Sequence, residues 1–242
     1  MMIKAAEQKS ILNYIVMLII PILGLAGGVA LSFALGINGK PVGNLLANIG
    51  FLLAVGSLIP IFKFSTEELG LKLKTSEMGF HIGATLTIFL GYVLFYIFVI
   101  RISSLKPIDS TVILSLITYL LVVFAEEIYF RGQVYSFIEK RFSARTALVV
   151  SAILFGLFHA SQGLRGIITK SITGALWGSV RYTTGMIYLL IIPVHFAYNA
   201  TWLLFEGNWD TPPGWAVFAV SIGELILTIL ILVIHRFRKS ST

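Results

Sequence analysis

Two adjacent glutamates and an arginine lie inside an otherwise apolar stretch, residues 120–132. A charged side chain near the middle of a bilayer costs at least ~2.5 to 3.5 kcal/mol, so three such residues close together require partners or a chemical task. On a helix, Glu127 and Arg131 are four residues apart and can form an ion pair on one face. The helical repeat turns Glu126 about 100° away from Glu127, which leaves it free for another role.

Later apolar stretches contain further polar residues, His159, His195 and Asn199. On a helix, Phe155 and His159 share one face, and so do His195 and Asn199. At 1.5 Å per residue, Glu126, His195 and His159 lie roughly 18, 15 and 20 Å from the inner ends of their predicted helices. A bundle can therefore bring these side chains around one polar cavity.

These residue types suit hydrolysis of a peptide bond by water. A carboxylate in a low-dielectric cavity is a better general base than a solvated one, so Glu126 is the candidate base and His159 can hold the water with it. His195 and Asn199 can both donate hydrogen bonds to a developing oxyanion. The chain has no cysteine, and no serine is placed with a base, so a covalent mechanism lacks a nucleophile.

Two other interpretations of the same residues stay open. Two glutamates and two histidines can also hold a divalent metal, as in a zinc metalloprotease. We favour a site without metal or other cofactor, because the sequence lacks His-Glu-x-x-His and Arg131 already accounts for Glu127. The second alternative is a non-enzymatic membrane protein, such as a transporter or an immunity protein, since intramembrane acids and histidines also build proton relays.

The composition indicates an integral membrane protein. Of the 242 residues, 57% are hydrophobic and 12% are charged, whereas roughly 25% of a soluble domain is charged. No polar interval is long enough for a soluble fold, so we expect a single membrane domain over residues 1–242 with a catalytic core over residues 111–205. The net charge of +7 is explained by basic residues between apolar stretches, which favours lipid headgroups over nucleic acid as partners.

The apolar stretches predict an all-α, polytopic membrane helix bundle with about eight transmembrane helices. The predicted spans are residues 11–35, 42–62, 80–100, 111–137, 143–159, 166–180, 185–205 and 215–234. With the N-terminus inside, twelve Lys and Arg residues fall in inner loops and five, including Arg165 and Lys170, in outer loops. This distribution predicts that both termini are cytoplasmic.

A few local signals within these spans can also be interpreted. The spacing of Gly24 and Gly28, like that of two glycines in the sixth span, is typical of closely packed helices. Ser143 is expected to cap the fifth span at its N-terminus. We interpret His81 as a residue of the membrane interface and Glu224, in the last span, as a polar contact inside the bundle.

Three motifs follow one another along the chain: Glu126-Glu127-x-x-x-Arg131, Phe155-x-x-x-His159 and His195-x-x-x-Asn199. Together they resemble the pattern of the CAAX protease and bacteriocin-processing family, which includes the type II CAAX prenyl endopeptidases, and no motif position departs from it. The resemblance implies a glutamate-dependent intramembrane endopeptidase of the cell membrane that cuts a membrane-associated or lipidated peptide or protein. Because the family also includes proteins of bacteriocin self-protection, precursor processing and immunity both stay open, and the sequence predicts no cleavage site or oligomeric state.

Overall fold

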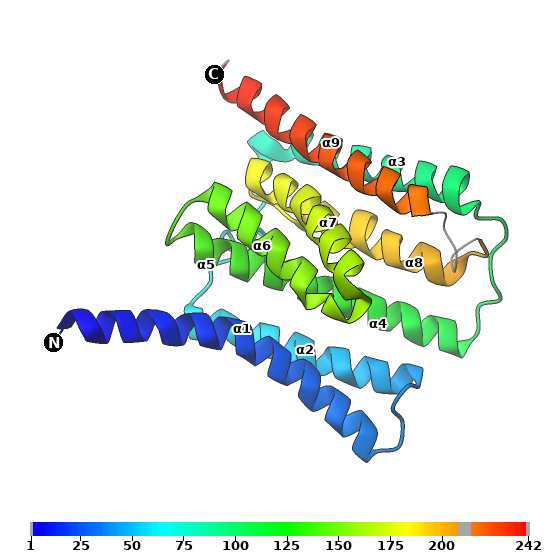
Figure 1. The fold of residues 1–242 in the computed structure, drawn as a ribbon, viewed down its shortest axis with the longest axis horizontal. Helices are drawn as coiled ribbons and strands as arrows, with labels where there is room; N and C mark the ends of the chain where they lie inside the picture. Colours follow the sequence, from blue (N-terminus) through cyan, green and yellow to red (C-terminus); the bar gives the residue numbers. More distant parts are fainter. Residues whose placement is uncertain (1, 208–213, 241–242) are drawn as a thin grey trace. The chain divides into compact units, whose positions relative to one another are not determined.

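The structure is a computed structural model that describes residues 2–207 and 214–240. In these two ranges the elements are helices, and an isolated bridge between Leu105 and Phe205 is the one extended pairing (Figure 1). The predicted all-α class is therefore confirmed. The chain divides into two compact units, Met1–Phe64 with Asp109–Ala125, and Ser65–Ile108 with Glu126–Thr242. The single-domain assignment and the limits of the catalytic core stay predictions.

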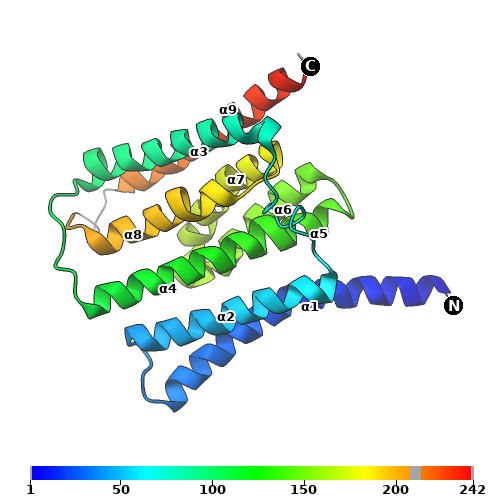
Figure 2. The ribbon, with the colours of Figure 1, turned by 180° about the vertical axis from the view of Figure 1, so that it is seen from behind.

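The first unit contains a helical hairpin formed by α1 (Met2–Ala34) and α2 (Pro41–Phe62) (Figure 2). Proline at the first position of α2 suits a helix start, because the missing N–H has no partner there in any helix. A Cβ atom on Gly24 would lie 2.4 Å from the Cβ of Ala54, and one on Gly28 would lie 2.5 Å from the carbonyl oxygen of Leu46. The close approach predicted from the glycine spacing is thus confirmed, and α2 is the partner.

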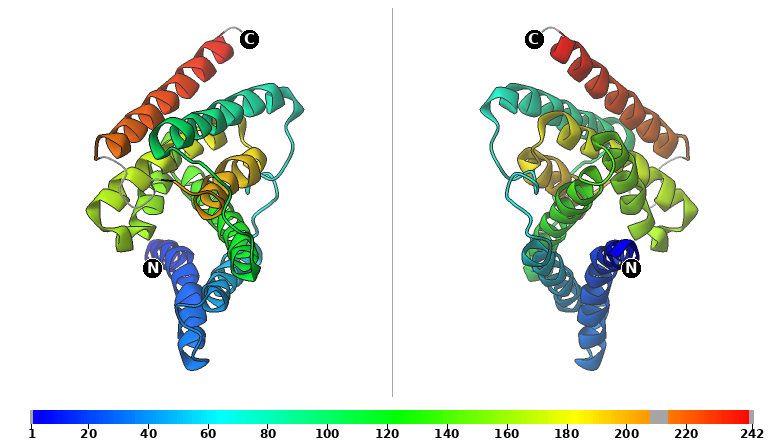
Figure 3. Two further views of the ribbon diagram at one scale, coloured as in Figure 1. Left: turned by 90° about the vertical axis from the view of Figure 1, so that its right-hand side faces the viewer. Right: turned by 90° about the vertical axis from the view of Figure 1, so that its left-hand side faces the viewer.

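The helix α4 (Ser110–Glu126) leads from the first unit into the second, where the chain continues without a break as the π-helical segment η2 (Glu127–Val134). The further elements of the second unit are α3 (Thr75–Phe95), η1 (Tyr96–Ile100), α5 (Tyr135–Glu139), α6 (Ala144–Phe158), η3 (Ala160–Gln162), α7 (Gly163–Thr184), η4 (Leu190–Phe196), α8 (Ala197–Leu204) and α9 (Gly214–Ser240). Helix α7 packs against α3, α6 and α9, and α3 and α9 lie together on one side of it (Figure 3).

The helices α6 and α7 form a tightly packed hairpin. Ser143 caps α6, as predicted, because its hydroxyl oxygen accepts a hydrogen bond from the backbone N–H of Thr146 at 3.1 Å. A Cβ atom on Gly156 would lie 2.4 Å from the carbonyl oxygen of Ile167, and one on Gly174 would lie 3.1 Å from that of Ala152. This close packing fixes where α7 presents its side chains to α6.

Five helices of the described chain are long and apolar enough to cross a membrane, and a bent pair would make a sixth. The chain is a multi-pass membrane protein, but the expected count of about eight spans is not confirmed. The fifth and sixth predicted spans form the bent pair, Ala144–Phe158 and Ala160–Thr184, at an angle of 60°. The seventh is a shorter helix than predicted, because η4, which contains Pro193, continues directly into α8 and the helix lies within residues 188–204. The orientation of the termini stays a prediction.

Two of the minor assignments were wrong. Arg165 and Lys170 were placed in an outer loop, whereas both lie within α7. His81 was placed at the interface, whereas its side chain is fully buried and Nδ1 lies 3.1 Å from the hydroxyl of Thr184. For His81 and Lys170 the sequence could not reveal which elements pack against the polar side chain.

Candidate active site

The carboxylate of Glu127 joins two other buried side chains. Its Oε1 accepts a hydrogen bond from Nη1 of Arg131 at 3.2 Å and another from Nδ1 of His195 at 2.9 Å. The exposed fractions of Glu127, Arg131 and His195 are 0%, 1% and 4%. The predicted ion pair is present, but the second partner of Glu127 was missed, because His195 lies 68 residues further along the chain.

His195 lies between the two adjacent glutamates. Because a carboxylate only accepts hydrogen bonds, Nδ1 of His195 carries the proton that bonds to Glu127. The other ring nitrogen, Nε2, faces Glu126 and lies 3.6 Å from its Oε2. This distance exceeds a direct hydrogen bond and suits a contact that a water molecule or a reacting atom completes.

Two of the π-helical segments, η2 and η4, carry residues of this cluster. Glu127 is the first residue of η2, and His195 lies in η4 two residues after Pro193. Such wide turns are rare and often occur at functional sites. In the regular α-helix assumed from the sequence, Glu126 and Glu127 would point about 100° apart. In the structure both carboxylates reach the same imidazole, one at each nitrogen.

Aromatic rings surround the buried charges. The guanidinium of Arg131 lies 4.1 Å from the ring centre of Phe155 and 5.3 Å from that of Trp177, within the range of cation–π attraction. The ring of Trp177 in turn lies 4.3 Å from the ring of His195. Phe155 was predicted as a supporting residue, whereas Trp177 was missed. The one signal for Trp177 in the sequence is its position between Gly174 and Gly178, the two glycines of α7 at close-packing spacing.

His159 ends α6 next to this cluster. Its Nδ1 lies 2.8 Å from the carbonyl oxygen of Phe155, so Nδ1 donates and Nε2 is left as an acceptor. The ring of Phe155 lies 4.7 Å from the ring of His159 and 6.4 Å from that of His195. The side chain of His159 is half-buried, which leaves an edge of the cluster accessible.

Asn199 is set apart from the other candidates. It lies in α8, one turn beyond His195, and is half-buried. In the described part of the chain, no hydrogen bond joins its side chain to another predicted site residue. The contacts therefore bring together Glu126, Glu127, Arg131, His195 and Phe155, with His159 beside Phe155, and leave Asn199 as a neighbour in the sequence.

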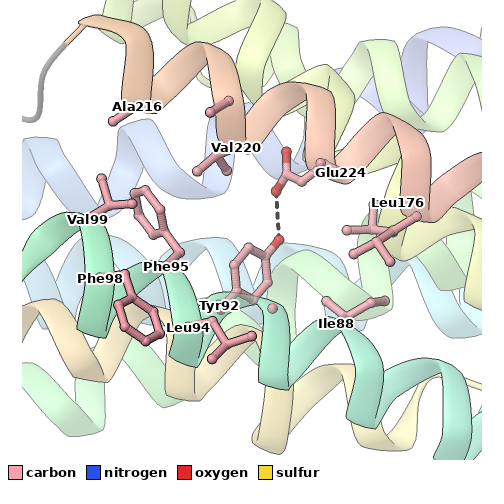
Figure 4. Close-up of a pocket in the computed structure, with 14 residues that line it drawn as sticks. Ile88, Tyr92, Leu94, Phe95, Phe98, Val99, Leu176, Ala216, Val220 and Glu224 are labelled. Atoms are coloured by element: carbon pink, nitrogen blue, oxygen red, sulfur yellow. Dashed lines mark hydrogen bonds between the residues drawn. The ribbon is translucent and has the colours of Figure 1, made fainter.

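A second buried acid connects to the cluster through Trp177. The hydroxyl of Tyr92 on α3 donates to Oε1 of Glu224 on α9 at 2.7 Å (Figure 4), and Nε1 of Trp177 donates to the same hydroxyl at 3.1 Å. Thr173 lies 3.0 Å from both carboxylate oxygens of Glu224. Beside them is a pocket of about 350 Å³ with mainly apolar walls from α3 and α9. The predicted polar contact of Glu224 is confirmed. Through the hydroxyl of Tyr92 it helps to hold Trp177, whose ring packs on His195.

Arg181, also on α7, fixes the position of η2. Its Nε donates to the carbonyl oxygen of Arg131 at 3.1 Å, and its Nη2 donates to that of Glu68 at 2.8 Å. A guanidinium is suited to this task because it presents several donors in a rigid plane. The turn at Glu68 is thereby joined to the segment that carries Glu127.

Among the described residues, no group of three or more His, Cys, Asp or Glu side chains has an arrangement that could hold a metal ion. Residues 107–201 match the family model described as type II CAAX prenyl endopeptidase Rce1-like, and this segment includes all three motifs. Over this segment the chain is similar to the CAAX proteases. The similarity and the long apolar helices together indicate a peptide hydrolase in a lipid environment, with a peptide as substrate. No curated protein matches the chain.

Proposed function

We propose that this protein is a CAAX-type protease that hydrolyses a peptide bond of a membrane-associated or lipidated peptide or protein with water that Glu126 activates. The observation that carries the proposal is the position of Glu126. Its side chain is only 9% exposed, and Oε2 lies 3.6 Å from Nε2 of His195, whereas Arg131 is paired with Glu127. A carboxylate with little access to bulk water and no cation bonded to it is suited to take a proton.

In the proposed reaction, Glu126 removes a proton from water while the water oxygen attacks the carbonyl carbon of the substrate. Nε2 of His159 is an acceptor, so it can hold the second hydrogen of that water. The tetrahedral intermediate collapses when the C–N bond breaks, and the proton on Glu126 passes to the leaving amine. No covalent bond between enzyme and substrate is formed.

His195 and Asn199 are proposed to stabilise the oxyanion of the intermediate. Because Nδ1 of His195 already donates to Glu127, Nε2 can donate to an oxyanion only when the ring carries a second proton. The carboxylate of Glu127 stabilises such a positive ring by Coulomb attraction at 2.9 Å. The side-chain amide of Asn199 is the second donor, once substrate is bound.

The matched family indicates the class of substrate. Its description contains the words CAAX prenyl endopeptidase, so a lipidated C-terminal peptide is the substrate we favour. Processing of bacteriocin or pheromone precursors and bacteriocin self-protection are further roles that we consider for the same site. We place the enzyme in the cell membrane and propose that it works without metal or other cofactor. A zinc-dependent peptidase is the runner-up, since Glu126 and His195 could supply two ligands.

The test compares Glu126→Gln with a matched control, Glu139→Gln, which removes an exposed carboxylate from the same membrane-spanning segment. Both variants and the wild type are purified and assayed on lipidated peptides in nanodiscs. We expect Glu126→Gln to fold normally and to lose activity by roughly 10²-fold or more, and Glu139→Gln to keep it. Near-normal hydrolysis by Glu126→Gln would remove the base from the mechanism. Membrane peptides that accumulate in cells with the Glu126→Gln form identify the natural substrate.

A further inference from the structure

Lys170 extends from α7 toward the predicted site. It lies one turn before Thr173 and two turns before Trp177, so the three residues share the face of α7 that points to Glu224 and His195. The ammonium nitrogen lies 5.1 Å from the ring centre of Tyr198, the residue directly before Asn199. Lys170 therefore brings a positive charge to the site from a helix that carries none of the three motifs.

The charge of Lys170 is not neutralised by an ion pair. Its ammonium group lies close enough to Glu126, His159 and His195 to act on each electrostatically. It also acts on Glu224. Within the part of the chain that the structure describes, however, no carboxylate lies within ion-pair distance of it. Lys170 differs in this from Arg131, whose guanidinium is paired with Glu127.

A half-buried cation in a membrane-spanning segment is costly and is typically retained for a task. An ammonium group is not needed for proton removal by Glu126, so the reaction itself does not account for it. Its three donors and single charge are suited to a carboxylate, and the ring of Tyr198 supports the ammonium by cation–π attraction. A peptide that is cut close to its C-terminus carries such a carboxylate into the site.

We propose that Lys170 binds the free α-carboxylate at the C-terminus of the substrate and thereby restricts hydrolysis to bonds near the end of a chain. This inference rests on the proposed function and adds a specificity residue to it. Hydrolysis then releases a short peptide that keeps the original carboxylate and gains a new amino group. The released peptide leaves Lys170 without a partner again.

The experiment uses three lipidated peptides that share one sequence. The first ends in a free carboxylate, the second ends in an amide, and the third is extended by several residues beyond the end of the first. Wild type, Lys170→Met and Lys170→Arg are compared in nanodiscs of zwitterionic lipid. The control is Arg165→Met, which removes an exposed cation from the same helix. We expect the wild type to prefer the free carboxylate over the amide by about 10-fold to 100-fold in kcat/KM.

Lys170→Met should lower kcat/KM for the carboxylate peptide to the level of the amide and leave the amide and the extended peptide unchanged. Lys170→Arg should restore most of the preference, and Arg165→Met should keep all of it. If Lys170 had only a structural role, Lys170→Met would instead lower kcat/KM for all three peptides together. Equal cleavage of carboxylate and amide by the wild type, or a preference that survives in Lys170→Met, would overturn the proposal.

A binding measurement separates this proposal from the proposed function. In the Glu126→Gln background, the peptide with a free carboxylate should bind about 10-fold to 100-fold more tightly than the amide, and Lys170→Met should remove the difference. This result is expected even if Glu126 is not the catalytic base. Equal affinity for both peptides overturns the proposal. It is also overturned if anionic lipid binds in a Lys170-dependent way and the carboxylate peptide does not displace it, since the ligand of Lys170 is then a lipid headgroup.

Discussion

Replacement of Arg131 by methionine removes a buried cation and keeps most of the volume of the side chain. Arg131 is 1% exposed, and its guanidinium bonds to Glu127 at 3.2 Å and lies over the ring of Phe155 at 4.1 Å. Loss of one partner of a buried ion pair costs about 3 to 5 kcal/mol, because the remaining charge is uncompensated. The lost cation–π contact adds to this cost, whereas the hydrogen bond from His195 to Glu127 reduces it.

A net loss of about 3 to 5 kcal/mol corresponds to a fall of roughly 6 to 20 °C in melting temperature for a chain of this size. Thermal unfolding of the purified protein in detergent measures it, with Arg145→Met as the control, because Arg145 is exposed on α6. The double variant Glu127→Gln with Arg131→Met should melt above Arg131→Met, since it leaves no unpaired charge.

Two outcomes would refute the reasoning about this ion pair. If Arg131→Met melted within about 2 °C of the wild type, the buried pair would contribute no net stability. If the double variant were no more stable than the single one, the uncompensated charge of Glu127 would not be the cause of the loss. A stable but inactive Arg131→Met protein would instead place Arg131 in the chemistry.

The remaining predictions concern a buried acid, an ion pair outside the membrane-spanning segments, and metal. Glu224→Leu leaves the hydroxyl of Tyr92 without its acceptor and should lower stability by about 1 to 3 kcal/mol, whereas Glu224→Gln should be closer to the wild type in melting experiments. The Lys140 ammonium holds the pKa of Glu68 below its ordinary value of 4.5, so this pair stabilises the protein above pH 4.5 and ceases to do so as the pH falls further. A difference in melting temperature between wild type and Glu68→Gln at pH 7 should therefore become smaller as the pH is lowered below 4.5. Exhaustive chelation of metal ions should leave the rate of hydrolysis unchanged, whereas His195→Ala should lower that rate by about 10²-fold to 10³-fold. One zinc ion per chain, with activity lost on chelation and restored by zinc, would favour the metalloprotease.

The sequence predicted those features of the site that depend on neighbours along one helix. The pair Glu127–Arg131 and the cap at Ser143 follow from spacings of three and four residues, and both are present. The second partner of Glu127 depends on how η4 packs against η2, and no local pattern encodes that contact. Likewise, the charge of Lys170 resembled that of a loop residue because only the fold shows what covers it.

The number of membrane spans could not be obtained from hydropathy alone. The apolar stretch around Pro193 has the composition of a spanning helix, yet the helix there, η4 followed directly by α8, lies within residues 188–204 and is shorter than the about 20 residues that a span needs. Hydropathy measures the cost of leaving water and contains no information on where a helix begins and ends. The glycines of α1 and α7 were better guides, since the absence of a side chain directly predicts close packing.

Because η2 and η4 are π-helical, the geometry of the site depends on the number of residues in these two segments. A π-turn contains one residue more than an α-turn, so the loss of a single residue within η2 would convert the wide turn to a regular one and change the directions in which its side chains point. The carboxylate of Glu127, the first residue of η2, would then no longer be directed at Nδ1 of His195. Relatives that keep all three motifs but lack one residue in either segment are therefore expected to have lost this arrangement, although a comparison of motif residues alone would score them as intact.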